Sequence, residues 1–211
     1  YFTKDGKRLD IKLIDPMLNF IYETVFGKVD QAILWKPRGS GGSISVSIII
    51  FLCMLYRKMS FILVAGSGEQ AQVVYKYVMN LWDCNTELSK AWLERQPTKT
   101  KIQTKKEVGG IYLECITATE KASRGKHPPG LVIDEASQSD SHTDKAIEAA
   151  MQGPLSEPEH LIIACSTFHN ATGLYQNLWD YADEKGYKQY KWDTIECMAP
   201  CREKIDCKKC F

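Results

Sequence analysis

The sequence lacks both a strong excess of charge and a long hydrophobic run. Its 27 Lys and Arg residues nearly balance its 26 Asp and Glu residues, which leaves a net charge of +1 over 211 residues. Because no global field then draws the chain to nucleic acid, any contact with DNA has to come from local patches. The longest apolar run, residues 44–56, includes two serines. It is shorter than the roughly 20 residues that span a bilayer, so no membrane partner is expected.

The composition is that of a globular protein. Hydrophobic residues make up 44% of the chain and charged residues 25%, which excludes a disordered chain. The sequence begins without methionine or a signal peptide, so we expect an excised or processed piece of something longer. Four scattered cysteines are predicted to be reduced thiols of an intracellular protein: Cys53, Cys84, Cys115 and Cys165.

Strand-like and helix-like segments alternate along the chain. Apolar residues recur at helical spacing over residues 16–26, with Asp15 as the N-cap and Gly27 as the stop. A first strand ends at residue 35. It is followed by a helix that ends at about residue 57, a strand over 61–65 and a helix over 69–82. Later segments repeat the pattern, with strands expected at 108–117, from Leu131 up to the carboxylates at 134 and 135, at 161–165 and at 188–192. This alternation predicts an α/β fold with a parallel sheet and ligand sites at the carboxyl ends of its strands.

A glycine-rich turn joins the first strand to the following helix. Glycines permit positive φ and close approach, so backbone N–H groups and the positive end of the helix can point at one phosphate. The turn therefore predicts a phosphate-binding loop, with an ordinary turn that binds nothing as the alternative. Its residues are Lys36, Pro37, Arg38, Gly39, Ser40, Gly41, Gly42 and Ser43.

The turn departs from the usual pattern G-x-x-x-x-G-K-[ST] at two positions. With Gly41 as the second glycine, Lys36 replaces the first glycine and Gly42 replaces the lysine. The ammonium of Lys36 can still fold back to the β- and γ-phosphates, because it acts there as a point charge. Arg38 is a candidate second cation, and Ser43 stands where such loops place the hydroxyl that binds magnesium.

Two adjacent carboxylates follow the strand that begins at Leu131. Asp134 and Glu135 would lie at the carboxyl edge of the sheet, beside the phosphate loop. In a nucleotide site the first carboxylate holds magnesium and the second orients or deprotonates the attacking water. The pair could instead cap a helix. Together with the glycine loop, it is typical of a Walker B element.

Ser166 and Thr167 end the strand at 161–165 and are expected to bind the γ-phosphate or the catalytic carboxylate. The following His169 is predicted to be a surface histidine rather than a ligand or base. A lysine-rich stretch over residues 98–106 is predicted to be a solvated strand or hairpin face, with contact to a phosphate backbone as the alternative.

Four cysteines crowd the last fifteen residues. The spacing C-x3-C-x5-C-x2-C has the two-pair form of a structural zinc site, although its middle interval is short. Disulfides, an iron–sulfur cluster and unliganded thiols are the alternatives. The candidate ligands are Cys197, Cys201, Cys207 and Cys210.

In this order, the elements resemble the ATPase domain of the large terminase subunit of tailed bacteriophages, the motor that packages DNA into a procapsid. The resemblance covers roughly residues 30–195. It depends on the runs WKPRGSGGS, VAGSGEQAQVVY, SRGKHPPGLVIDEAS and IIACSTFHN. The last run is similar to the Ser-Thr-Pro coupling motif of the family, with Phe168 in place of the proline.

The resemblance implies a role for each matching residue. Lys36, Arg38, Gly41 and Ser43 would contact the phosphates and Mg²⁺ of ATP, Asp134 would hold Mg²⁺, and Glu135 would be the catalytic base. Ser166 and Thr167 would couple hydrolysis to movement. Arg38 is also a candidate for neutralising γ-phosphate charge in cis, and candidates for doing so from a neighbouring subunit are Arg57, Arg95, Arg124 and Arg202.

The sequence thus predicts a P-loop ATPase domain of the additional-strand type over residues 1–195, and a Cys-rich segment over 196–211. A C-terminal nuclease domain would follow in full-length members, so no nuclease activity is expected of this chain. The implied partners are double-stranded DNA, the portal protein, the small terminase subunit and identical subunits in a ring, although the isolated domain could be a monomer. The implied location is the host cytoplasm.

Three other functions remain as alternatives. One is a helicase-like ATPase of superfamily 2, which would need a second domain of the same kind. Another is a catalytically weak assembly module that binds nucleotide, in which Gly42 would mark lost hydrolysis; the presence of Glu135 argues against it. The third is a nucleic-acid-binding module centred on the cysteines, which the net charge disfavours.

Overall fold

Seven strands form one sheet in the computed structural model, which describes residues 13–65, 68–117, 128–136, 141–167 and 172–197. The order across the sheet is β3-β4-β2-β5-β6-β1-β7, and β3 alone runs antiparallel to its neighbour. The strands are β1 Gln31–Trp35, β2 Phe61–Ala65, β3 Lys101–Gln103, β4 Tyr112–Thr117, β5 Gly130–Asp134, β6 Leu161–Ser166 and β7 Lys188–Lys191. The predicted α/β fold with a mainly parallel sheet is confirmed.

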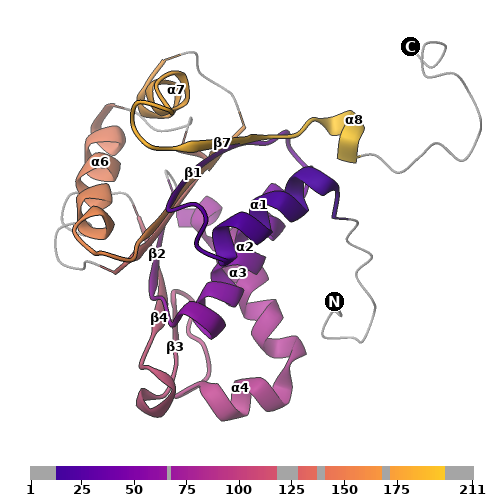
Figure 1. The fold of residues 1–211 in the computed structure, drawn as a ribbon. Coiled ribbons are helices and arrows are strands. Elements are labelled where there is room, and N and C mark those ends of the chain that lie inside the picture. Colours follow the sequence, from indigo (N-terminus) through magenta and orange to yellow (C-terminus); the bar gives the residue numbers. More distant parts are fainter. Residues whose placement is uncertain (1–12, 66–67, 118–127, 137–140, 168–171, 198–211) are drawn as a thin grey trace, which may run out of the picture.

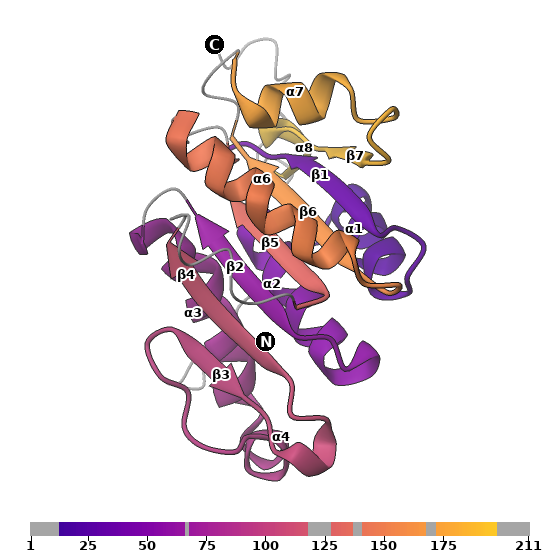
Figure 2. The ribbon, with the colours of Figure 1, turned by 90° about the vertical axis from the view of Figure 1, so that its left-hand side faces the viewer.

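Helices cover both faces of the sheet. Figure 1 shows α1, α2 and α3 on one face, and Figure 2 shows α6 and α7 in front of the other. Each face has its own apolar core, because strands buried on both sides send alternate side chains to opposite faces. The helices are α1 Asp15–Val25, α2 Gly42–Leu52, α3 Gly68–Cys84, α4 Thr86–Trp92, α6 Ser141–Leu155, α7 Leu174–Asp180 and α8 Thr194–Cys197.

Several expected boundaries shift by a few residues. Helix α1 is capped by Ile14 rather than Asp15, because Pro16 is preorganised for the first helical turn and Asp15 already belongs to it. The helix after the glycine loop reaches residue 57 only by changing to a π-helix over Cys53–Arg57. The strand expected from residue 108 begins at 112, because a short 3₁₀ turn over Lys106–Val108 and two glycines with positive φ precede it.

Three neighbouring strands bring the predicted site residues to one edge. Strand β6 lies between β1 and β5, which is the additional strand that the sequence predicted. Trp35 pairs with Ser166, and Asp134 pairs with Cys165, so the carboxyl ends of all three strands are level. The glycine loop, the two carboxylates and the two hydroxyl residues therefore meet at the same edge.

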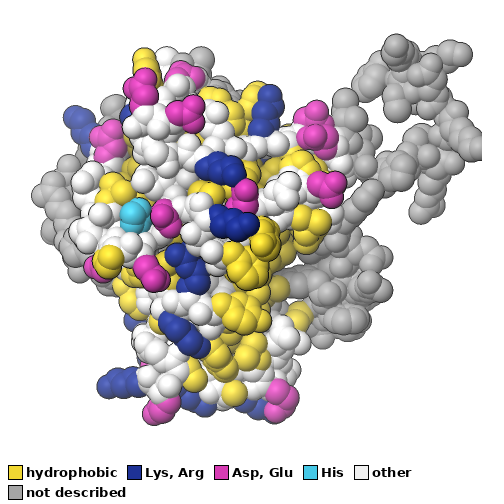
Figure 3. Space-filling view, in the orientation of Figure 1, with side chains coloured by type: hydrophobic (Ala, Val, Ile, Leu, Met, Phe, Trp, Pro, Cys, Tyr) yellow, Lys and Arg dark blue, Asp and Glu magenta, His cyan; other side chains and the backbone are white. Residues whose placement is uncertain are grey.

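The charges on the described surface are mixed. In Figure 3, Lys and Arg side chains lie among Asp and Glu side chains over the face in view, in agreement with the small net charge. The middle of the lysine-rich stretch forms the antiparallel strand β3, so its prediction as a strand is confirmed. Among the described residues, the helices are too short or too polar to cross a membrane.

Gly130 provides a test of the sheet packing. A Cβ atom at this position would lie 2.3 Å from Cδ1 of the buried Phe61, its partner in the register of β2 and β5. Because the ring covers the glycine, Gly130→Ala is expected to lower the free energy of unfolding by about 1–3 kcal/mol. Urea denaturation followed by circular dichroism measures the change.

The matched control is the pair of substitutions Gly130→Ala and Phe61→Leu in one chain. The smaller side chain at position 61 leaves room for the new methyl group, so the double variant should lose less stability than the two single losses added together. Strictly additive losses would show that the ring does not limit this position.

Candidate active site

The glycine loop between β1 and α2 has the backbone that phosphate binding requires. Gly39 and Gly41 adopt φ values of 73° and 81°, a region that favours glycine, and Gly41 is the N-cap of α2. The hydroxyl of Ser40 donates to the carbonyl of Pro37 at 2.7 Å and closes the turn. The loop thus places backbone N–H groups and the positive end of α2 at the same point.

Trp192, just after β7, fixes the loop from behind. Its indole N–H lies 3.2 Å from the carbonyl oxygen and 3.1 Å from the hydroxyl oxygen of Ser40, and both residues are buried. The thiol of Cys197 also donates to the Ser40 carbonyl, at 3.5 Å. The loop is therefore attached to the segment that follows the last strand of the sheet.

The side chain of Lys36 crosses the loop directly over Gly42. A Cβ atom on Gly42 would lie 2.2 Å from Cδ and 3.0 Å from Cβ of Lys36. Such distances are far inside van der Waals contact, so any side chain at position 42 would exclude the observed path of the lysine. The two departures from the usual loop pattern therefore fit together: the lysine stands at position 36, and the glycine at position 42 leaves its path open.

The ammonium of Lys36 lies among the predicted site residues. Its Nζ atom is 3.0 Å from Oδ1 of Asp134, 3.4 Å from Oε1 of Glu135 and 2.9 Å from the hydroxyl of Ser43. Burial acts to lower the pKa of Lys36, but the carboxylates of Asp134 and Glu135 beside it outweigh burial and raise the pKa above its ordinary value. The lysine is therefore a buried, permanent positive charge next to the loop.

Asp134 is 2% exposed, and its Oδ1 atom accepts hydrogen bonds from two donors in addition to Lys36. The thiol of Cys165 donates to this oxygen at 3.2 Å, and the backbone N–H of Glu135 does so at 3.1 Å. Burial, followed by the nearby Asp134 carboxylate, raises the pKa of Cys165 well above its ordinary value. The thiol is therefore protonated and able to donate.

Glu135 is turned into the site by its backbone. Its φ of 53° lies in the left-handed region, which non-glycine residues rarely adopt and which is often found at functional sites. Its Oε2 atom accepts hydrogen bonds from the hydroxyl of Thr167 at 2.9 Å, from the N–H of Thr167 at 3.3 Å and from the hydroxyl of Ser166 at 3.4 Å. Ser166 and Thr167, at the end of β6, thus hold the carboxylate of Glu135, directly after the neighbouring strand β5.

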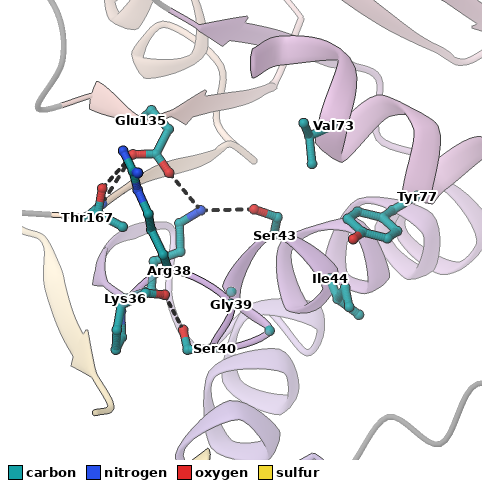
Figure 4. Close-up of a pocket in the computed structure, with 13 residues that line it drawn as sticks. Lys36, Arg38, Gly39, Ser40, Ser43, Ile44, Val73, Tyr77, Glu135 and Thr167 are labelled. Carbon is teal, nitrogen blue, oxygen red and sulfur yellow. Dashed lines mark hydrogen bonds and ion pairs between the residues drawn. The ribbon is translucent and has the colours of Figure 1, made fainter. Parts of the chain in front are cut away.

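Lys36, Glu135, Thr167 and the glycine loop line a cavity of about 260 Å³ above the loop. Figure 4 shows Arg38 extending from the loop toward Glu135, and Ser43 facing the ammonium of Lys36. Tyr77 and Val73 of α3, together with Ile44, form a wall that the sequence analysis did not predict. Val73 is 44% exposed although it is apolar. An apolar residue directly before the buried face that begins with Val74 and Tyr75 was the signal available in the sequence.

Some predicted residues lie outside the described part of the chain or away from the site. Among the arginines that the structure describes, Arg38 alone lines this cavity, whereas Arg57 donates to the carbonyl of Thr24 and Arg95 borders a separate hollow beside α4. Arg124, Phe168, His169, Arg202 and three of the four clustered cysteines, Cys201, Cys207 and Cys210, fall outside the described residues. Within those residues, no group of three or more His, Cys, Asp or Glu side chains is arranged to hold a metal ion.

Several solved structures with a similar fold are large terminases of bacteriophages or their ATPase domains. The HK97 bacteriophage large terminase superposes with a TM-score of 0.66 at 20% identity, over 95% of this chain and 41% of its own. The large terminase ATPase domain of Thermus phage P74-26 gives 0.60 at 14% identity, over 87% and 86% of the two chains. A large terminase from a thermophilic bacteriophage, in complex with ATP-γ-S, gives 0.62 at 11% identity, over 90% and 47%.

The sequence itself matches no protein-family model and no curated protein. The chain spans less than half the length of the HK97 protein and of the protein solved with ATP-γ-S. The likeness is therefore one of fold, and it extends over nearly all of this chain. The chain has the fold of the ATPase domains of phage large terminases.

Proposed function

We propose that this chain is the ATP-hydrolysing motor domain of a large terminase, which drives double-stranded DNA into a viral procapsid. The observation that carries the proposal is the meeting of Lys36, Asp134 and Glu135 above the glycine loop, at distances of 3.0 and 3.4 Å from the ammonium. Positive and negative groups so arranged suit a phosphate chain with its metal. The fold, shared with terminase ATPase domains, supports the same function.

Phosphate binding would fall to the loop and to Lys36. The N–H groups at the start of α2 would hold the β-phosphate, and the ammonium would turn from the two carboxylates to the β- and γ-oxygens. Arg38 extends toward the same space and would neutralise charge on the γ-phosphate. Val73 and Tyr77 offer an apolar surface beside Ile44 to the rest of the nucleotide.

The oxygen ligands around the loop fit Mg²⁺. This hard cation prefers carboxylate, hydroxyl and water oxygens, and it commonly takes one or two protein ligands together with substrate phosphates. Asp134 and the hydroxyl of Ser43 are the candidates, since both contact the ammonium of Lys36 and would become available when it turns away. Bound there, the ion would neutralise charge that develops on the β- and γ-phosphates.

Glu135 is the proposed general base. Its carboxylate would orient a water molecule in line with the γ-phosphate and accept the proton as the water attacks. Thr167 and Ser166 hold this carboxylate through its Oε2 atom, so a change at the γ-phosphate would reach them through Glu135. We propose the end of β6 as the place where hydrolysis is converted into movement.

The remaining parts of the proposal concern segments beyond the site. Residues 1–195 would form the motor domain, and the clustered cysteines after residue 196 would hold Zn²⁺. The portal protein, the small terminase subunit and identical neighbours in a ring would be the partners, with a neighbour's arginine completing each site. The host cytoplasm would be the location.

Substitution of the two central charges tests the proposed reaction. Lys36→Ala should weaken binding of ATP about tenfold or more, because charge-assisted hydrogen bonds to phosphate are lost. Glu135→Gln should still bind ATP but lower turnover about 10²- to 10⁴-fold, because the base is removed. Phosphate release with Mg²⁺, with and without double-stranded DNA, measures turnover, and a fluorescent ATP analogue measures binding.

The ion pair of Lys188 and Glu23, which join at 2.8 Å far from the cavity, supplies the matched controls. Lys188→Ala and Glu23→Gln should leave both binding and turnover unchanged. Full turnover by Glu135→Gln would disprove its role as the base. A wild-type chain that binds ATP without turnover, even at high protein concentration, would favour the assembly module.

A second prediction concerns the dependence of Lys36 on Gly42. Gly42→Ala should weaken ATP binding about tenfold, because the new methyl group would displace the lysine side chain at a cost of about 1–3 kcal/mol. Exchange of the two residues, Lys36→Gly with Gly42→Lys, should restore much of the binding, since it recreates the usual loop pattern. Titration with a fluorescent ATP analogue measures all three chains, and unchanged binding by Gly42→Ala would contradict the assigned path of Lys36.

A further inference from the structure

The Oδ1 atom of Asp134 is unusually crowded with donors. Lys36, Cys165 and the backbone N–H of Glu135 contact this one oxygen at 3.0, 3.2 and 3.1 Å. Three donors on one carboxylate oxygen fix the rotation of the group about its last bond. The other oxygen, Oδ2, is then directed by the bonds that Oδ1 makes.

The sheet itself brings the thiol to this oxygen. Cys165 pairs with Asp134 on one side and with Leu34 on the other, in the middle of three parallel strands. Paired residues of neighbouring strands send their side chains to the same face, so the contact is built into the register. Cys165 is fully buried, and its sulfur also lies 3.5 Å from the carbonyl of Ile133. Its single proton favours the carboxylate, which is the closer and charged acceptor.

The three donors differ in what happens to them when nucleotide binds. Lys36 would turn to the phosphates, as proposed above, and its bond to Oδ1 would be lost. The N–H of Glu135 belongs to the residue that follows Asp134 and cannot leave. The thiol is the remaining side-chain donor, and it is held in the core of the sheet.

We propose that Cys165 is a positioning residue that keeps the Asp134 carboxylate in its metal-binding orientation after Lys36 has moved to the nucleotide. The inference rests on the proposed function, because it needs Asp134 to hold Mg²⁺. Donors behind a metal ligand commonly affect metal affinity about 10- to 100-fold. The role requires a hydrogen-bond donor at position 165, and a side chain that merely fills the space would not supply it.

Serine and alanine at position 165 separate these two roles. Cys165→Ser keeps a donor of similar size, whereas Cys165→Ala removes the donor and leaves a small void. Cys53→Ala is the matched control, because Cys53 is equally buried, belongs to the same apolar core as Cys165, and is not among the residues that line the cavity. Thermal unfolding of each variant establishes that it is folded before binding is measured.

The experiment measures the affinity for N-methylanthraniloyl-ADP, once with Mg²⁺ and once with EDTA. Cys165→Ala should reduce the gain in affinity that Mg²⁺ provides by about tenfold, with the affinity in EDTA unchanged. Cys165→Ser and Cys53→Ala should keep the gain of the wild type. Equal gains in Cys165→Ala and wild type, or an equal loss in Cys165→Ser and Cys165→Ala, would overturn the role of the thiol as a donor.

Raman spectroscopy tests the thiol without nucleotide or metal. The S–H stretching band of each thiol is identified as the one that is lost when that cysteine is replaced, in Cys165→Ser and in Cys53→Ala. The band of Cys165 should lie at the lower frequency, because a hydrogen bond to a carboxylate weakens the S–H bond. A band at the frequency of a free thiol would overturn the proposal even if Cys165→Ala did not fold. A wild-type chain that binds no nucleotide, with a shifted S–H band, would instead overturn the proposed function and leave the thiol contact standing.

Discussion

The buried ammonium of Lys36 is the interaction on which the candidate site depends. It joins the residue after β1 to the two carboxylates at the end of β5 and to the first turn of α2, and Lys36 is 4% exposed. A charge so deeply buried is tolerated because acidic groups surround it. It reaches them only because Gly42 leaves its path open. The site is therefore held together by the ammonium that, in the proposed function, would bind the phosphates.

Much of the fold could be predicted from the sequence, because the central strands are buried on both faces. Such strands appear as short, continuous apolar runs, and the strand predicted at 61–65 has the boundaries of β2 in the structure. The position of the site followed as well, since parallel strands present their carboxyl ends at one edge. The ends of elements were harder to predict, because the proline in the first turn of α1 and the paired glycines before β4 act through local backbone geometry.

The sequence could not reveal contacts that depend on three-dimensional paths. The sequence pattern does not show that Gly42 makes room for the side chain of Lys36. In the pattern, Gly42 is only a position at which the usual lysine is absent. The left-handed backbone of Glu135 is a local feature that no pattern of residue types specifies. The hydrogen bond from the Cys165 thiol to Asp134 depends on the register of β5 and β6. Tyr77 reaches the cavity because α3 packs against α2, a distant contact that periodicity does not specify.

The attachment of Ser40 to Trp192 has a mechanical consequence. One indole N–H reaches both oxygens of Ser40, and its ring is buried beside Phe20 of α1. The tip of the glycine loop cannot shift without breaking these bonds or carrying the indole along. A force applied to the chain beyond residue 193 would therefore be transmitted through the Trp192 side chain to the glycine loop.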